Sequence, residues 1–181
     1  RVLYYPPQGD ALERAEKGAT LSCTELLSAA ALLRSARACL HSVHSFADER
    51  IVRLKELTEY LISDHALEED ITTKIVGENE LQDHASDKLF AIRREIRLLN
   101  ERIRARLQEY LAGGERKYLQ DELITMRGDR YVLPVKVEYK RAVRGLIHDR
   151  SQSGQTVFIE PEEVLEMNNE LRTLHLDEEQ E

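Results

Sequence analysis

Two short groups of side chains have the residue types that metal binding or catalysis requires. Cys39, His41 and His44 lie within six residues of one another in a stretch with helical spacing, and the two histidines could share one face of a helix. A metal site would need at least one further ligand and suitable geometry. We therefore expect structural or surface roles for these three residues and predict no metal site.

The second group is His148, Asp149, Ser151 and Ser153, which are residue types of a hydrolytic triad. Contiguous triad members on one hairpin rarely converge in space. The sequence also contains no GxxxxGK[ST] phosphate loop, no GxGxxG loop and no HExxH zinc motif, so nucleotide hydrolysis and zinc proteolysis have no local basis here. We predict no catalytic and no cofactor-binding residue in these 181 residues, and hence no enzyme activity of this segment by itself.

The overall charge argues against uniform attraction to nucleic acid. The chain has 26 Lys and Arg against 34 Asp and Glu, a formal net charge of −8. The sign changes along the chain, because residues 88–117 hold 9 basic and 4 acidic groups and residues 127–150 hold 7 and 3, whereas residues 151–181 hold 1 and 9. A nucleic-acid role must therefore use a local basic patch.

The basic segment 127–150 is the best candidate for such a patch. Its Lys136, Lys140, Arg141, Arg144 and Arg150 lie near expected strand ends and turns, where side chains could reach phosphates. The alternative is a solvated sheet face whose edge charges discourage aggregation. The arginines of residues 88–117 could pair with the acidic residues of 151–181 rather than with nucleic acid.

Helical spacing of apolar residues dominates the first 112 residues. We predict a small bundle from four patterns: a short helix over 10–16 stopped by Gly18, a longer one capped by Ser22 or Thr24, one carrying Ile51 to Ile62, and one carrying Leu67, Ile71 and Ile75. A long helix is expected over 86–112, ended by Gly113 and Gly114. Its apolar residues recur at steps of three and four, a narrow seam that fits one partner helix.

From Leu123 the pattern changes to β-rich runs: LITM, RYVLPVKVEY, VRGLIH and QTVFIE. These runs predict three or four antiparallel strands within residues 120–160, with Pro134 at an edge or a bulge. Pro161 then opens a last helix with Glu162 and Glu163 in its first turn. This helix could be the partner that the long helix requires.

Several of these runs are specific enough to indicate a family. RYVLPVK (130–136), GLIHDRSQSGQTVFIEP (145–161) and NNEL (168–171) closely resemble bacterial MutS-two proteins, and ALERAEKGATLS (11–22) and IRREIRLLNERIR (92–104) are similar to the core and lever of that family. The resemblance implies a mainly α fold with a small antiparallel β region. Its expected parts are a helical core bundle (1–85), a lever helix (86–118), a β-rich clamp (119–160) and the start of a returning lever helix (161–181).

The resemblance also implies a function. Proteins of this family bind branched DNA and suppress homologous recombination, and some recognise collided ribosomes through rRNA; they are homodimers that use ATP and Mg²⁺, and many carry an Smr endonuclease domain. We expect those ATPase and nuclease residues beyond Glu181. A segment serving mainly in assembly is an alternative of a different class. The predicted nucleic-acid-binding set is Lys136, Lys140, Arg141, Arg144, His148 and Arg150.

Location and completeness give further expectations. No run approaches 18 uncharged apolar residues, and the N-terminal residues lack the features of a signal peptide, so we expect no membrane contact. Cys23 and Cys39 lie 16 residues apart in one helical pattern, about 24 Å by helical rise, which is beyond disulfide reach. Unpaired thiols fit the cytoplasm. Because the sequence begins with Arg, we expect a piece of a longer chain.

Overall fold

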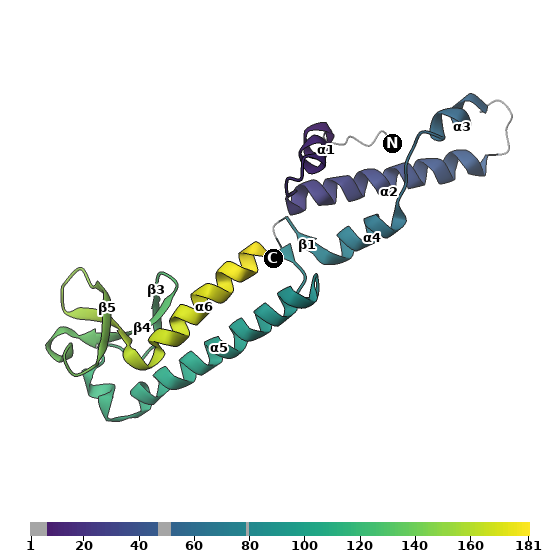
Figure 1. Ribbon diagram of the computed structural model, residues 1–181. Helices are drawn as coiled ribbons and strands as arrows, with labels where there is room; N and C mark the ends of the chain where they lie inside the picture. Colours follow the sequence, from purple (N-terminus) through teal and green to yellow (C-terminus); the bar gives the residue numbers. More distant parts are fainter. Residues whose placement is uncertain (1–6, 47–51, 79) are drawn as a thin grey trace. The chain divides into compact units, whose positions relative to one another are not determined.

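The computed structural model describes residues 7–46, 52–78 and 80–181, and the chain divides into two compact units, residues 1–86 and 87–181. Both units are drawn in Figure 1, coloured along the sequence. The architecture is mainly α-helical with two small antiparallel sheets among the described residues, which confirms the predicted fold class. No helix in the described ranges is both long enough and apolar enough to cross a lipid bilayer.

The described part of the first unit contains four helices, as the sequence predicts. They are α1 (Gly9–Glu16), α2 (Cys23–Ser45), α3 (Val52–Thr58) and α4 (His65–Lys74). Gly18 follows α1 with a φ of +83°, a left-handed conformation that stops the helix at little cost in glycine. Ser22 Oγ accepts a hydrogen bond from the Glu25 amide, and the Glu25 carboxylate accepts one from the Ser22 amide. This reciprocal capping box identifies Ser22 as the cap of α2.

Helices α2 and α4 pack against each other through a small apolar cluster and a buried carboxylate. Ala30, Ile71 and Ile75 form the buried cluster. Arg37 Nε donates to Glu68 Oε2 at 3.0 Å, and Arg34 Nε donates to Glu68 Oε1 at 2.9 Å. Hydrogen bonds from Arg37 and then Arg34 lower the pKa of Glu68 to about 2.

The first unit departs from the sequence prediction in two places. The predicted third helix, Ile51 to Ile62, ends at Thr58, and Leu61 and Ile62 lie after it with exposed side chains; Ile51 lies outside the described residues. Ile75 does not continue α4 but begins a two-stranded sheet of β1 (Ile75–Gly77) and β2 (Glu80–Leu81). Leu61 and Ile62 find no core to cover them, because this unit buries few side chains. Ile75 is buried with Ala30 and Ile71, but it reaches that cluster from β1 and not from α4.

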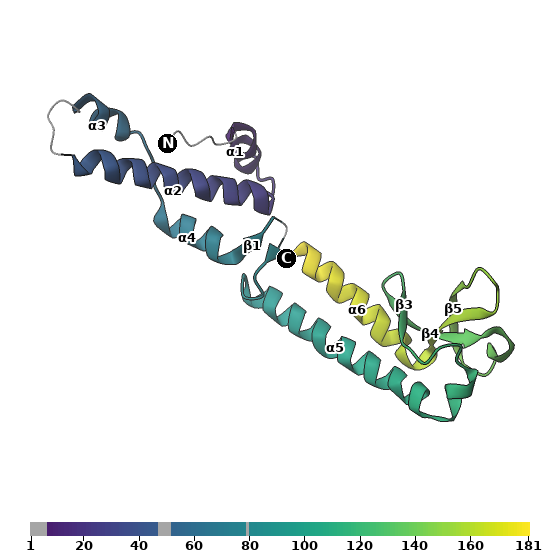
Figure 2. The same ribbon diagram turned by 180° about the vertical axis from the view of Figure 1, so that it is seen from behind.

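The second unit is built on two antiparallel helices, α5 (Asp87–Ala112) and α6 (Glu162–Gln180). Figures 1 and 2 show them side by side, with the strands gathered where α5 ends and α6 begins. The predicted seam is buried along α5, and Val164 and Leu171 of α6 pack into it. The expected pairing of the long helix with the last helix is therefore confirmed. The buried seam residues of α5 are Leu89, Ile92, Ile96, Leu99, Ile103 and Leu107.

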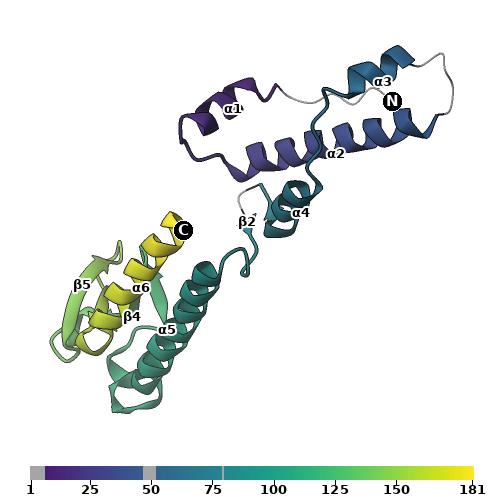
Figure 3. The same cartoon turned by 45° about the vertical axis from the view of Figure 1, so that its right-hand side comes forward.

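Of the three or four antiparallel strands expected, four are present, in one sheet of order β3-β4-β6-β5. Figure 3 shows β5 at the side of this sheet. Two single-turn 3₁₀ helices, η2 and η3, lie in the connections that precede and follow β3 and β4. The bounds are η2 (Gly114–Tyr118), β3 (Thr125–Arg127), β4 (Arg130–Lys136), η3 (Val137–Tyr139), β5 (Gly145–Arg150) and β6 (Thr156–Pro161).

Pro134 lies in β4, a central strand rather than an edge strand, opposite Phe158 of β6. On its other side β3 pairs only as far as Val132. The carbonyl of Pro134 accepts a hydrogen bond from the Gln120 amide at 2.8 Å. The missing amide hydrogen of Pro134 therefore lies on the side where β3 has already ended, which explains how a central strand accommodates it.

Candidate nucleic-acid interface

Two of the predicted binding residues lie together at one end of the four-stranded sheet. Lys136, the last residue of β4, is opposite Thr156, and Arg150, the last residue of β5, is opposite Val157. Because Thr156 and Val157 are adjacent in β6, both cations lie at the same end of the sheet. Between them the 151–155 turn connects β5 to β6, with Gly154 at a φ of +71°, as expected for a turn glycine.

The other end of β5 holds Arg144. Gly145 is opposite Pro161, and the carbonyl of Arg144 accepts a hydrogen bond from the Glu162 amide at 3.1 Å. Lys140 and Arg141 lie in the connection that runs between the two ends, which Val143 anchors in the core. The predicted cations therefore follow the connection from β4 to β5 around the sheet and do not form one compact cluster.

Four of these residues carry a charge that no described residue neutralises. Lys140, Arg141, Arg144 and Arg150 are exposed, and their side chains form no ion pair with any residue that the structure describes. By contrast, Arg127 pairs with Asp149 at 3.2 Å, and the guanidinium of Arg127 stacks 3.6 Å from the centre of the Phe158 ring. The unpaired cations remain available to an external anion.

His148 has a different environment from the five predicted cations. It lies at an irregularity in the pairing of β5 with β6, and its Nε2 is 2.5 Å from Glu160 Oε2. Only 27% of its side chain is exposed. The imidazole thus faces a buried carboxylate of the same chain, so we do not retain His148 among the residues expected to contact phosphate.

Glu160 is the centre of a polar network that the sequence interpretation missed. Its side chain is fully buried, and Arg130 donates from Nε to both carboxylate oxygens and from Nη2 to Oε1, at 2.8 to 3.0 Å. Asn168 Nδ2 donates to Oε1 at 2.7 Å. Burial alone would raise the pKa of Glu160, but hydrogen bonds from Arg130, Asn168 and His148 outweigh it and lower the pKa.

The same network connects the sheet to both helices. Asn168 of α6 accepts from the Tyr131 amide at 3.2 Å and donates to the Tyr131 carbonyl at 3.1 Å, so its side chain pairs with β4 as a neighbouring strand would. Tyr131 Oη donates to Asn100 Oδ1 of α5 at 2.7 Å. The network therefore fixes the sheet on the helix pair. One signal was present in the sequence: Glu160 is the single charged residue in the otherwise apolar run TVFIEP.

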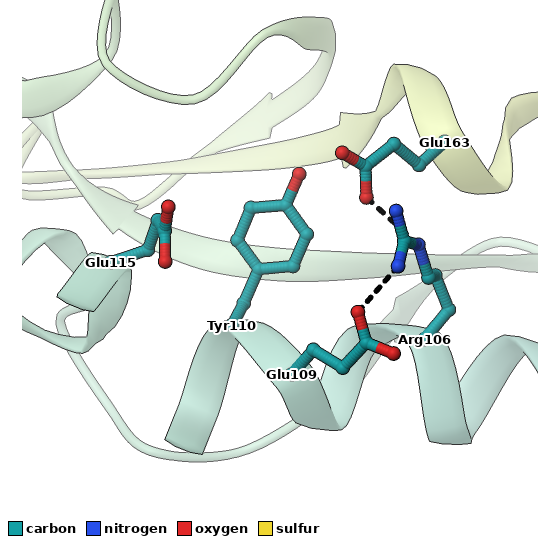
Figure 4. A pocket seen from close by; sticks show the side chains of 5 residues that line it. All are labelled: Arg106, Glu109, Tyr110, Glu115 and Glu163. Atoms are coloured by element: carbon teal, nitrogen blue, oxygen red, sulfur yellow. Dashed lines mark hydrogen bonds and ion pairs between the residues drawn. The ribbon is translucent and has the colours of Figure 1, made fainter. Parts of the chain in front are cut away.

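The acidic last helix pairs with the arginine-rich helix, as one sequence interpretation proposed. Arg93 Nε is 2.7 Å from Glu178 Oε1, and Arg106 Nε is 3.0 Å from Glu163 Oε2. Figure 4 shows Arg106 between Glu163 and Glu109, beside Tyr110 at the end of α5. Burial, followed by the Glu163 carboxylate, raises the pKa of the Tyr110 hydroxyl. Part of the acidic end of the chain is therefore paired with α5 of the same molecule.

The residues considered for catalysis do not converge. Asp149 faces Arg127, His148 faces Glu160, and Ser151 Oγ lies 3.2 Å from Ser153 Oγ. In the ranges that the structure describes, no three His, Cys, Asp or Glu residues are placed to hold a metal ion. The four residues considered for a triad therefore do not form one in the described structure.

The second unit defines a class of protein: an antiparallel helical arm that ends in a small sheet with unpaired cations. The chain is also similar in sequence to known proteins. The chain is 43% identical over 173 residues to Endonuclease MutS2 of Clostridium beijerinckii, 40% over 189 residues to that of Acetivibrio thermocellus and 42% over 170 residues to that of Clostridium perfringens. These matches cover 93 to 97% of the chain and 22 to 23% of each relative. No protein-family model matches.

By sequence the chain is a relative of the bacterial MutS-two family over nearly its whole length, which confirms the resemblance. It spans about a fifth of the length of the curated relatives it matches.

Proposed function

We propose that this chain is the nucleic-acid-binding core, lever and clamp segment of a MutS-two-type protein, with the sheet region as the clamp and α5 and α6 as the two lever arms. The observation that carries the proposal is the set of exposed, unpaired cations Lys140, Arg141, Arg144 and Arg150. Cations that face solvent without a partner can displace the counterions of a phosphate backbone, which is the main source of affinity for nucleic acid. The relatives are named endonucleases, a name that fits nucleic-acid partners.

The preferred ligand in this proposal is branched DNA, such as a recombination intermediate, and the role is the suppression of homologous recombination. Backbone cations recognise shape and carry no base-specific information. ATP, Mg²⁺, the endonuclease activity and a homodimeric state belong in this proposal to the full-length protein. A cytoplasmic location is also part of it, because Cys23 and Cys39 are both free thiols.

The test is charge reversal in the whole 181-residue chain. Lys140→Glu, Arg141→Glu and Arg144→Glu together should weaken binding to a four-way DNA junction by at least about tenfold at low salt and reduce the slope of log affinity against log salt by about two to three. The matched control reverses Arg94, Arg102 and Arg104, which are exposed on α5 and form no ion pair with a described residue. Equal affinity and equal salt slope in wild type and the clamp variant would refute the proposal.

A second candidate function is assembly with another protomer through the first unit. It rests on exposed apolar side chains there, including Leu57, Tyr60 and Ile62, since contiguous exposed apolar surface often marks an interface. Sedimentation of the chain with and without branched DNA separates the two functions. Self-association without DNA affinity supports assembly, and binding to collided ribosomes without affinity for DNA junctions supports an rRNA-directed clamp.

A further inference from the structure

Two segments far apart in the sequence meet beside the end of β4. Leu119, which follows η2, bridges to Val135 of β4, and Lys136 Nζ donates to the Lys117 carbonyl at 3.3 Å. The ring of Tyr118 from η2 lies 5.1 Å from the ring of Tyr139 from η3, centroid to centroid, with the planes tilted by 45°. The fold thereby builds an aromatic pair from two residues that the sequence does not associate.

The two rings of the pair have different surroundings. Tyr118 packs against the main core of the second unit, and so it supports the structure. Tyr139 is 38% exposed, and every other aromatic residue of 87–181 is less exposed. A ring face that remains partly at the surface can stack on a base of a ligand.

Cations surround these rings. Lys117 Nζ lies 5.1 Å from the centre of the Tyr118 ring, and Lys140 and Arg141 directly follow Tyr139. Segments 113–118 and 136–141 together contain five basic and two acidic residues. A hollow of about 550 Å³ is lined by Lys117 and Lys136 and also by Arg116 and Glu122, which pair with each other; neither tyrosine lines it. Aromatic rings beside a positively charged groove are the recurrent means of holding single-stranded nucleic acid, because every base has a face that can stack.

We propose that the Tyr118–Tyr139 pair, with Lys117, Lys136, Lys140 and Arg141 around it, binds an unpaired nucleotide: a base stacks on Tyr139 and the adjacent phosphates contact the cations. The inference rests on the proposed function and specifies the ligand as nucleic acid with an unstacked base. In a continuous duplex the base faces are covered by neighbouring bases, so phosphates alone would contact this surface. The site thus favours a single-stranded segment over an intact helix.

The experiment measures the whole chain by fluorescence anisotropy with oligothymidylate and oligouridylate of about 12 nucleotides and with a blunt DNA duplex of the same length. Tyr139→Leu keeps an apolar side chain against Tyr118 but removes the stacking face. We expect about tenfold weaker binding of the single strands, with duplex binding unchanged. Tyr139→Phe should retain wild-type affinity, and Tyr60→Leu, at another exposed tyrosine, is the matched control. The two single strands show whether DNA, RNA or both supply the ligand.

A second measurement needs no variant: a 2-aminopurine base in the single strand should lose fluorescence on binding to the wild-type chain, because it stacks on the ring. Absence of this loss, or equal weakening of duplex and single strands by Tyr139→Leu, overturns the inference and leaves the phosphate-binding function standing. A wild-type chain that binds the duplex and not the single strands does the same. A chain that binds none of these nucleic acids overturns both proposals.

Discussion

The guanidinium of Arg130 and the fully buried carboxylate of Glu160 form a fork of hydrogen bonds 2.8 to 3.0 Å long, which joins β4 to β6 inside the second unit. The remaining bonds to this carboxylate come from Asn168 on α6 and His148 on β5. No polar side-chain atom buried in the described residues lacks a partner. Removal of one partner from such a buried ion pair strongly lowers the free energy of unfolding, because the other charge is left buried and uncompensated.

Arg130→Ala should therefore lower the free energy of unfolding by about 3 to 5 kcal/mol, the usual cost of leaving a buried charge without its partner. Urea denaturation followed by circular dichroism measures this. Arg172→Ala is the matched control, because Arg172 forms an exposed pair with Asp129 at 3.6 Å and such pairs contribute at most about 1 kcal/mol. Similar losses of unfolding free energy in the two variants would show that the Arg130–Glu160 pair does not hold β4 to β6.

The free energy of unfolding of the first unit should depend on pH through the Glu68 carboxylate. Its pKa of about 2 in the folded chain lies below the value of about 4.3 for an unfolded glutamate. A lowered folded pKa means that the contribution is complete above about pH 4.3 and is lost as the pH falls towards 2. NMR titration of the Glu68 carboxyl carbon measures the pKa directly. Arg37→Gln removes the largest cause of the shift and should move the pKa upwards; an unmoved pKa would contradict this origin.

Sequence patterns predicted those parts of the fold that depend on local periodicity. The steps of three and four along α5 predict its buried seam, because side-chain direction follows directly from helix geometry. The β-rich runs after Leu123 predict three or four strands, and four are present. The same rule failed at Leu61 and Ile62, which continue a helical pattern but lie beyond the end of α3. Periodicity shows which residues would share a face, not whether another element covers that face.

The candidate site was only partly predictable for a related reason. Lys140 and Arg141 are exposed as expected. That His148 faces Glu160 could not be read from the sequence, because the burial of Glu160 depends on tertiary packing. Tyr118 and Tyr139 are 21 residues apart, and their contact at 5.1 Å depends on how two connections cross the end of β4. Neither the His148–Glu160 contact nor the Tyr118–Tyr139 contact can be recognised from residue spacing in a single sequence.

Gly145 should not tolerate a side chain. A Cβ atom at this position would lie 2.0 Å from the backbone carbonyl oxygen of Glu160, and a backbone atom in a paired strand cannot move without disrupting the pairing of β5 with β6. Gly145→Ala should destabilise the chain by at least about 2 kcal/mol, measured by thermal or urea unfolding. Gly114→Ala provides the control, since a Cβ there meets no atom within 4 Å. Equal stability of the two variants would argue against the close approach of these strands.

The last prediction concerns the packing of α5 against α6. Helix α5 has one buried and one exposed side, so substitutions on the two sides should differ in their effect on stability. Ile103 is fully buried in the seam, and Ile103→Ala should cost about 2 to 5 kcal/mol through lost burial and the cavity that remains. Leu98 lies on the same helix with 43% of its surface exposed, so Leu98→Ala should cost less than about 1 kcal/mol. Urea unfolding of both variants gives the comparison. Comparable losses would mean that α5 packs against α6 through a different face, and the register of the acidic helix along the arginines would then also be wrong.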